Sequence, residues 1–361
     1  MKLNIMSWFD PIILILMFVA LVLNILIAYL WYKKFYRKLG LITYKSIQRI
    51  HLNETPRLGG LIFIILLALF TEFSHNNQII YLLNPILISL IPIMIVGFKE
   101  DLFHNVAPAI RLFALLFAGW LFISNFIGSL PILTGIPLIE KLIMFQGGLA
   151  IFYILSIAAV ANGMNLIDGV NGLCGAVALS ILSALLFLSY KTGDTTMLSL
   201  IFSLILLLIP FLLVNYPFGL IFLGDLGAYS LGFILSALTI IFFGRHPEIS
   251  PWAAMLILSY PVTEVILSIL RRIITGKQIY HPDKSHLHLK LFLFFRSFPD
   301  FKKIANAIVT PVLSLLWLFP LISITWTYHK EFFVWVSIAL FNVFYGFLYI
   351  VFSKKYKKLD I

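Results

Sequence analysis

Charged residues are scarce in this chain. They make up 11% of its 361 residues, whereas apolar residues make up 61%; a soluble globular protein carries about 25% charged residues. This deficit excludes a water-soluble globular fold. The chain also has a single cysteine, Cys174, so it cannot contain an internal disulfide framework.

Uncharged apolar runs, by contrast, recur along the whole sequence. Each is near the length of about 20 residues with which a helix crosses a hydrocarbon core. The sequence therefore predicts an all-α integral membrane protein with one domain over residues 1–361. We expect about eleven transmembrane helices, at 11–32, 58–74, 79–98, 109–127, 143–161, 173–190, 196–214, 228–243, 252–270, 304–325 and 332–352.

Basic residues are distributed unevenly between these runs. Segments 33–57, 98–111, 271–303 and 354–358 carry 21 of the 26 lysines and arginines. Because basic loops are retained in the cytoplasm, this asymmetry predicts an external N-terminus and a cytoplasmic C-terminus. The net charge of +11 is spread over these loops rather than gathered on one face, so nucleic acid is not an expected partner.

Four groups of polar residues end or follow the apolar runs on the predicted cytoplasmic side. They are Glu100-Asp101, Asn162 to Asn171, Phe222-Leu-Gly-Asp225-Leu-Gly, and His281 to His288. Polar groups persist at this depth only against water or protein, which makes them candidates for function. Arg57 adds a guanidinium at the start of run 58–74, where free helix N–H groups bind anions. The sequence therefore predicts an active-site cleft on the cytoplasmic face.

The residue types in this cleft favour phosphate chemistry. A few carboxylates inside a basic rim are typical of a divalent cation that holds phosphates. Asp225 lies between glycines with room for a phosphate, and Asn165 offers a second oxygen to the same ion. Mg²⁺ is the expected ion, with Mn²⁺ as the alternative. Lys284, His286 and His288 can contact phosphate oxygens or a leaving group.

Five motifs, in this order, resemble those of the polyprenyl-phosphate N-acetylhexosamine-1-phosphate transferases, glycosyltransferase family 4. They are Pro56-Arg57-Leu-Gly59-Gly60, Gly97-Phe-Lys-Glu100-Asp101, Asn162-x-x-Asn165-x-x-Asp168-Gly, Phe222-Leu-Gly-Asp225-x-Gly and Pro282-Asp-Lys-Ser-His286-Leu-His288. The resemblance implies transfer of a sugar 1-phosphate from a UDP-N-acetylhexosamine to undecaprenyl phosphate, with release of UMP. This reaction would start a cell-envelope glycan, such as O-antigen, capsule or teichoic acid, at the bacterial cytoplasmic membrane.

The resemblance also implies roles for individual residues. Asp101 would serve the lipid phosphate, and Asp168 with Asn162 would lie near the nucleotide. In full, it implies catalysis by Asp101, Glu100, Asp168, His286 and His288, substrate binding by Asn162, Asn165, Arg57, Lys284 and Asn171, and metal binding by Asp225 and Asn165.

Three positions depart from the family's motifs. Glu100 stands where the family usually has Asp, Asn171 where bacterial members carry a second Asp, and Leu289 where a further histidine often occurs. Glu100 keeps the charge on a longer side chain, and eukaryotic relatives resemble this chain at Asn171. A role of the third histidine does not transfer to Leu289.

Two mechanisms are considered for Asp101. A phosphate monoester has a second pKa near 6 and is mostly dianionic at pH 7, and taking its remaining proton onto an Asp of pKa near 3.9 costs roughly 2.7 kcal/mol. We therefore expect direct attack by the lipid phosphate, positioned by Asp101. A covalent aspartyl intermediate stays the alternative.

Plainer roles also fit several of these residues. Asp225 could cap a helix, the two histidines could be solvated, and Glu264 could pair with a polar neighbour or line the cleft. For the whole chain, the alternatives are a non-catalytic lipid or ion transporter and an inactive relative. The segment 277–303 is expected to select the sugar, whose identity the sequence leaves open, and a homodimer stays an alternative to a monomer.

Overall fold

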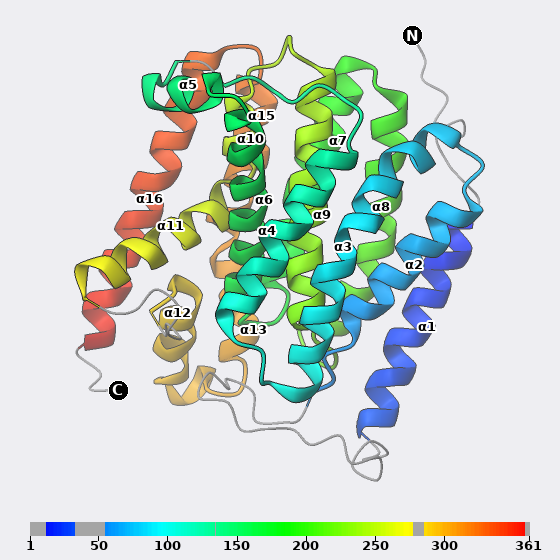
Figure 1. Ribbon diagram of the computed structural model, residues 1–361. Coiled ribbons are helices and arrows are strands. Elements are labelled where there is room, and N and C mark those ends of the chain that lie inside the picture. Colours follow the sequence, from blue (N-terminus) through cyan, green and yellow to red (C-terminus); the bar gives the residue numbers. More distant parts are fainter. Residues whose placement is uncertain (1–11, 33–54, 134, 277–284, 358–361) are drawn as a thin grey trace.

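The computed structural model describes residues 12–32, 55–133, 135–276 and 285–357, and these form helices joined mostly by short loops (Figure 1). In chain order the helices are α1 (Ile12–Tyr32), α2 (Gly59–Phe73), α3 (Asn77–Phe103), α4 (Pro108–Asn125), α5 (Pro137–Met144), α6 (Gly148–Ile167), α7 (Leu173–Thr192), α8 (Thr195–Asn215), α9 (Gly224–Arg245), α10 (Trp252–Ile257), α11 (Ser259–Ile274), α12 (Leu287–Arg296), the 3₁₀ helix η3 (Pro299–Phe301), α13 (Ala305–Val312), α14 (Ser314–Trp317), α15 (Phe319–Thr327) and α16 (Glu331–Lys357).

Nine segments of the described chain are long and apolar enough to cross a membrane. They are α1, α3, α4, α6, α7, α8, α9, the run from α13 to α15, and α16. This supports the predicted all-α membrane architecture. The predicted number, about eleven, stays unconfirmed, and so does the predicted orientation.

Two predicted spans differ from single full-length helices. Helix α2 has only 15 residues, and the predicted span 252–270 is divided at Leu258 into α10 and α11. Pro261 lies in the first turn of α11, where a missing N–H is tolerated, so it favours a new helix start. The sequence analysis did not use Pro261 as an indication of this break.

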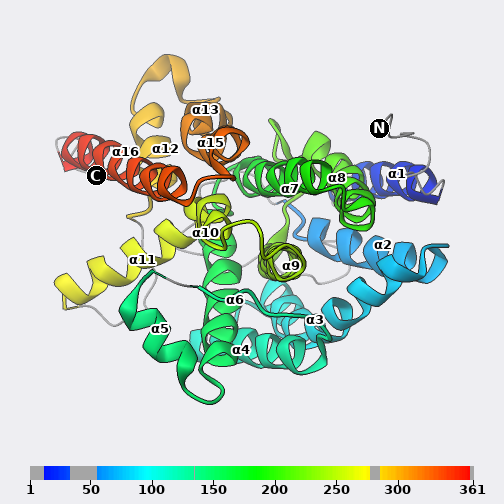
Figure 2. The same cartoon turned by 90° about the horizontal axis from the view of Figure 1, so that it is seen from above.

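Helix α11 leans outward from the bundle (Figures 1 and 2). Its buried side carries Thr263, Glu264 and Ser268, whereas Ile266 and Leu270 are exposed. This distribution is the reverse of that in a soluble amphipathic helix. It suits a helix with lipid on its outer side and polar groups against protein.

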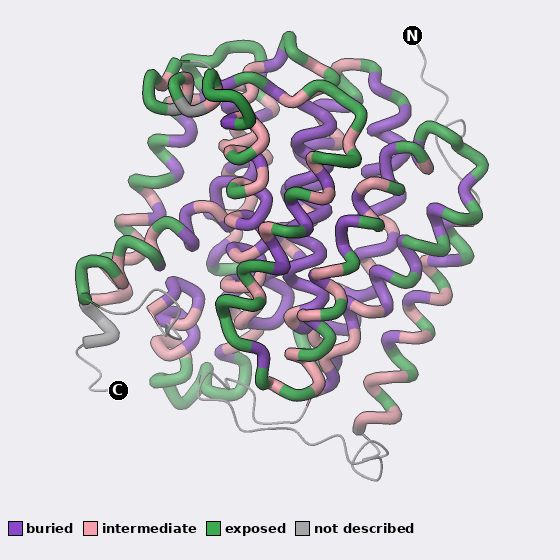
Figure 3. Tube along the Cα trace, in the orientation of Figure 1, coloured by how far each residue is buried: buried purple, intermediate pink, exposed green. Residues whose placement is uncertain are grey.

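Helix α9 is the centre of the molecule. In the view from above it lies among α3, α6, α7 and α10 (Figure 2), and the burial map colours nearly its whole length as buried (Figure 3). The apolar window of α9 is 100% buried. Its N-terminus is therefore placed by protein contacts rather than by lipid.

The beginnings of α2 and α9 are joined at two glycines. A Cβ added to Gly60 would lie 2.1 Å from the Cα of Gly227. The backbone amides of Gly59 and Gly60 also donate to the carbonyls of Phe222 and Leu223, each at 3.0 Å. Only glycine permits this approach, which brings the loop before α2 next to the first turn of α9.

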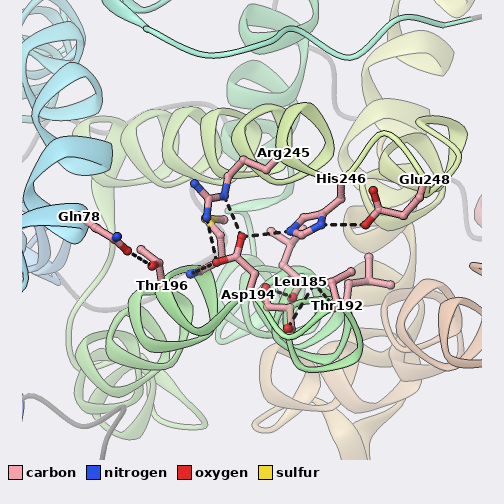
Figure 4. Close-up of polar contacts among 11 residues, drawn as sticks. Gln78, Leu185, Thr192, Asp194, Thr196, Arg245, His246 and Glu248 are labelled. Atoms are coloured by element: carbon pink, nitrogen blue, oxygen red, sulfur yellow. Dashed lines mark hydrogen bonds and ion pairs between the residues drawn. The ribbon is translucent and has the colours of Figure 1, made fainter.

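An ion-pair cluster holds the other end of α9 (Figure 4). Asp194, the N-cap of α8, accepts from the Met197 amide at 3.0 Å and from Nε and Nη2 of Arg245 at 2.7 and 3.1 Å. Its Oδ2 is also 3.0 Å from Nε2 of His246. Burial opposes the ionised form, but these hydrogen bonds and the charge of Arg245 outweigh it and hold the pKa of Asp194 below its ordinary value.

Candidate functional site

Asp101 caps the N-terminus of α9. It lies in the last turn of α3, and its Oδ1 and Oδ2 accept hydrogen bonds from the backbone amides of Asp225 and Leu226 at 2.8 and 3.0 Å. Gly224 has a φ of +79°, and a Cβ there would lie 2.5 Å from Asp101 Oδ2. Asp101 thus supplies from α3 the carboxylate that an N-cap residue of α9 would otherwise provide.

Two arginines surround the Asp225 carboxylate. Arg57 Nη1 is 3.9 Å from Asp225 Oδ1 and 3.8 Å from Asp101 Oδ1. Arg111 Nη1, from the first turns of α4, is 3.0 Å from Asp225 Oδ2. The side chains of Arg57 and Arg111 are 39% and 23% exposed. Asp225 therefore lies between two partly exposed guanidinium groups at the end of the bundle where α9 begins, here called the site end.

Glu100 belongs to the same network. Its Oε1 is 3.7 Å from Arg111 Nη1, and its Oε2 accepts from the backbone amide of Val106 at 2.8 Å. The second contact fixes the turn between α3 and α4, which carries Arg111 toward the site. Glu100 thus keeps a carboxylate in the cluster at the position where the family usually has Asp.

Asn162 and Asn165 lie in the last turns of α6, and Asp168 is its C-cap residue. Their spacing of three residues puts them on neighbouring turns of one helix face, and each is half-buried. Burial raises the pKa of Asp168 well above its ordinary value; the charge of Arg57 opposes this rise, and the charges of Asp225 and Asp101 add to it. These charge effects put Asp168 in the same electrostatic environment as the α9 N-terminus.

The two histidines of the last motif are buried rather than solvated. His286, the N-cap residue of α12, is 4% exposed, and its Nδ1 lies 3.0 Å from Oε2 of the fully buried Glu264 on α11. Glu264 therefore pairs with a polar neighbour, one of the two roles expected for it. The rings of His286 and His288 stack, with centroids 5.7 Å apart.

His288 links α12 to the Asp168 loop. A Cβ added to Gly169 would lie 2.6 Å from His288 Nε2, so the imidazole packs against the residue that follows Asp168. Burial lowers the pKa of His288 to about 3; the charge of Glu264 opposes this and that of His286 adds to it. The ring is therefore neutral at pH 7. Its Nδ1 has no hydrogen-bond partner among the described residues.

Asn171 is buried, and its hydrogen bonds serve the scaffold. Its Nδ2 donates to the Pro217 carbonyl at 2.8 Å, its backbone amide donates to Asn306 Oδ1 at 2.6 Å, and its carbonyl accepts from Thr310 Oγ1 at 2.7 Å. These bonds tie the α6–α7 loop to the α8–α9 loop and α13. Its predicted role in substrate binding stays a prediction.

Sequence reasoning missed Arg111 as a site residue. We counted it only among the basic residues that set topology, although a charge in the first turns of an apolar helix was a usable indication. Its partner Asp225 is far away in the sequence, so the pair itself is invisible there. Lys284, predicted to bind substrate, lies outside the described residues, as does His281.

The donor set of the site suits a hard divalent cation. Asp101, Asp168, Asp225 and Asn165 offer oxygen atoms, the ligands that Mg²⁺ prefers. In the described part of the chain no three His, Cys, Asp or Glu side chains are grouped as an all-protein metal site. Because both Asp101 oxygens already accept backbone hydrogen bonds, Asp225 is the better placed ligand. A bound ion would then draw most of its coordination from phosphates and water.

Comparison with known proteins agrees with this chemistry. Residues 83–243 match the family model of glycosyl transferase family 4. This match includes Glu100, Asp101, Asp168 and Asp225, the acidic residues of the site.

Curated relatives cover much of the chain. It is 27% identical over 297 residues, 78% of each protein, to a probable undecaprenyl-phosphate N-acetylglucosaminyl 1-phosphate transferase of Bacillus subtilis. It is 27% identical over 242 residues, 67% of this chain and 69% of the relative, to an undecaprenyl-phosphate α-N-acetylglucosaminyl 1-phosphate transferase of Thermotoga maritima. It is also 27% identical over 254 residues, 66% of this chain and 76% of the relative, to a phospho-N-acetylmuramoyl-pentapeptide-transferase of Levilactobacillus brevis. These matches confirm the resemblance that the five motifs predicted.

Proposed function

We propose that this chain, whose residues 83–243 match the model of glycosyl transferase family 4, transfers an N-acetylhexosamine 1-phosphate from a UDP-sugar to undecaprenyl phosphate and releases UMP. One observation carries this proposal: at the site end, the carboxylates of Asp101 and Asp225 meet the guanidinium groups of Arg57 and Arg111. The names of the curated relatives support the general reaction, a sugar-1-phosphate transfer to undecaprenyl phosphate. The setting would be the bacterial cytoplasmic membrane, and the product would start an envelope glycan.

The proposed reaction exchanges one phosphoanhydride bond for another. An oxygen of the lipid phosphate attacks the phosphorus that carries the sugar, and a new P–O–P bond forms. The bond from that phosphorus to UMP breaks, and UMP leaves with the bridging oxygen and its electron pair. Such transfers depend mainly on in-line positioning and charge neutralisation. The charged side chains of this site can position the phosphates and neutralise their charge.

Arg57 and Arg111 would bind the phosphates. Both pair with Asp225 through a single guanidinium nitrogen and remain partly exposed. Each can therefore donate other N–H groups to phosphate oxygens while it stays beside the aspartate. A planar guanidinium suits two oxygens of one phosphate, so these residues would hold the pyrophosphate against the N-terminus of α9.

Asp225 would hold the divalent cation, with Asn165 as a second oxygen ligand. When bound, Mg²⁺, or Mn²⁺ as the alternative, would neutralise charge on the pyrophosphate. Asp168 would add negative charge that favours the cation. Asn162 would remain available for the nucleotide.

Asp101 would position the site rather than attack the substrate. Its side chain is 4% exposed, and both of its oxygens accept backbone hydrogen bonds from α9. A nucleophile would have to give up these bonds and the cap of the helix that carries Asp225. This geometry supports direct attack by the lipid phosphate over a covalent aspartyl intermediate.

The histidine pair would complete the site beside Asp168. Glu264 holds Nδ1 of His286, which leaves its Nε2 for a phosphate oxygen or leaving group. In the neutral His288 ring, Nδ1 has no hydrogen-bond partner among the described residues. The His288 ring can therefore donate or accept a hydrogen bond at pH 7 without carrying charge.

The test is UMP release by the purified protein with undecaprenyl phosphate, Mg²⁺ and a panel of UDP-N-acetylhexosamines. We expect release that requires lipid and stops with EDTA, and the best donor identifies the sugar. Asp225→Asn should lower turnover by about 10²-fold or more, the usual effect of removing an electrostatic contact to a transition state.

Glu248→Gln is the matched control, because it makes the same carboxylate-to-amide change on an exposed residue at the opposite end. Its turnover should equal that of the parent. No UMP from any donor, in folded protein, would contradict the proposal and favour a transporter or an inactive relative. Normal turnover of Asp225→Asn would contradict the metal assignment alone.

A further inference from the structure

Residues 296–304, which begin at the last residue of α12, are all exposed. This segment, here called the aromatic elbow, reads Arg-Ser-Phe-Pro-Asp-Phe-Lys-Lys-Ile and contains η3. Phe298, Phe301 and Ile304 are 43%, 42% and 50% exposed. Three basic side chains and one acidic side chain accompany them. Large apolar groups interleaved with cations are typical of a segment that lies in a membrane interface.

The exposed rings rest on a rigid support. Phe298 packs edge-on against Phe294, with centroids 5.1 Å apart, and Phe301 packs against Phe295 at 6.1 Å. Phe294 in turn contacts Phe352 of α16 at 5.4 Å. The elbow is therefore an aromatic wedge held by the bundle.

The elbow occupies the outer edge of the molecule at the site end. Viewed from above, the chain after α12 projects beyond α13 and α16 (Figure 2), and in the side view it lies level with the lower ends of the long helices (Figure 1). A segment placed there meets the headgroup region of the adjacent leaflet, because the neighbouring spans cross that leaflet.

We propose that the aromatic elbow docks on the anionic surface of the leaflet at the site end. Phe298, Phe301 and Ile304 would insert among the headgroups, and the basic residues Arg296, Lys302 and Lys303 would pair with anionic lipids. Each basic residue near such a surface raises the binding constant for the anionic membrane about fivefold. This assigns residues 296–303 a different role from the sugar selection expected of 277–303.

Docking would also hold the histidine pair in place. Helix α12 has ten residues; its N-cap is His286, its first turn carries His288, and the elbow begins at its last residue. Because α12 is this short, a fixed position of the elbow at its C-terminal end would also fix the position of the two histidines at its N-terminal end. This second step rests on the proposed function, whereas the docking itself does not.

The experiment places a spin label at Phe301→Cys in the full chain, with Asp300→Cys as the neighbouring control. The native Cys174 is 2% exposed and should not react. In vesicles of equal phosphatidylcholine and phosphatidylglycerol, we expect the label at 301 to collide more with oxygen and less with a water-soluble nickel chelate than the label at 300. Equal chelate access at both positions would overturn the docking.

A second comparison tests the charges. Lys302→Gln with Lys303→Gln should move the label at 301 toward water in the mixed vesicles, and should leave it unchanged in phosphatidylcholine alone. Lys330→Gln, at the opposite end, should have no effect. A double variant whose label stays in lipid would overturn the role of anionic lipid.

A third comparison tests the link to the histidines. UMP release by the parent should be several-fold faster in the mixed vesicles than in phosphatidylcholine, and the lysine double variant should lose this preference. If docking holds but the double variant keeps the preference, the link to α12 is wrong. If the parent releases no UMP in either vesicle, the proposed function fails while the label measurements still decide the docking.

Discussion

Asp168 is an acidic residue of the site whose ionised form is opposed by its surroundings. Burial makes the largest contribution to its raised pKa. The nearby carboxylates of Asp225 and Asp101 raise the pKa further, and the charge of Arg57 opposes the rise. A folded state that binds a proton more tightly than the unfolded state loses stability as the pH rises above the ordinary pKa of Asp. The ionised Asp168 is therefore a cost to folding at neutral pH.

Asp168→Asn should therefore be more stable than the parent at pH 8 and equal to it near pH 4, where both side chains are neutral. We expect a melting temperature higher by roughly 2 °C, the shift that about 1 kcal/mol produces in a large domain, together with a loss of transfer. Thermal unfolding in detergent with EDTA, from pH 4 to 8, measures this. A parent that gains stability over the variant as the pH rises would contradict it.

At the residue scale, the motifs predicted which side chains form the site, but not the contacts that these side chains make. The pattern Gly-Phe-Lys-Glu-Asp marked Asp101 as a substrate contact, yet its two oxygens hold the first amides of α9. Neither this cap nor the Arg111–Asp225 pair can be predicted from one sequence. In both cases the partners come from different helices, and only packing brings them together.

At the scale of elements, the contact of α2 with α9 sets the geometry of the site. Gly227→Ala would put a Cβ 2.5 Å from the Cα of Gly60, and backbone cannot move aside as a flexible side chain can. The helices would have to separate, at a cost of about 1–3 kcal/mol for overpacking. Arg57 and Asp225 would move apart with them.

We expect Gly227→Ala to melt at a lower temperature and to release UMP at least about tenfold more slowly. Gly346→Ala on α16 is the control, because a Cβ there meets nothing within 4 Å and alanine favours a helix by up to about 1 kcal/mol. Parental stability and turnover in Gly227→Ala would contradict a tight α2–α9 contact.

The elements themselves were largely predictable, because apolar length alone defines most of them. The predicted spans coincide closely with α1, α4, α7 and α8. The break at Leu258 and the short helix α5 were not predicted, because the spans were assigned from the length of apolar runs, and a run of sufficient length does not show where a helix breaks. The motif around Asp225 was expected before a helix, whereas it forms the first turn of α9, because a loop and a helix start share the same glycines.

For the whole molecule, the two ends of the bundle should face opposite sides of the membrane. Lys191→Cys lies at the end held by Asp194, and Asp300→Cys lies at the site end; both positions are exposed. A membrane-impermeant maleimide should label Lys191→Cys in intact cells and Asp300→Cys only after permeabilisation. The parent, whose Cys174 is buried, is the control and should stay unlabelled. The opposite pattern would contradict the predicted orientation.

The complete burial of α9 has a consequence for how the protein is made. Helix α9 is apolar enough to cross a membrane, yet its apolar window faces protein on all sides in the folded chain. Its main neighbours α2, α3, α6 and α7 all precede it in the chain. These helices can therefore be in the membrane before α9 leaves the ribosome, and α9 can pack between them. The insertion of α9 would deliver Asp225 to the arginines, and the histidine pair on α12, which follows in the chain, could join the site only afterwards.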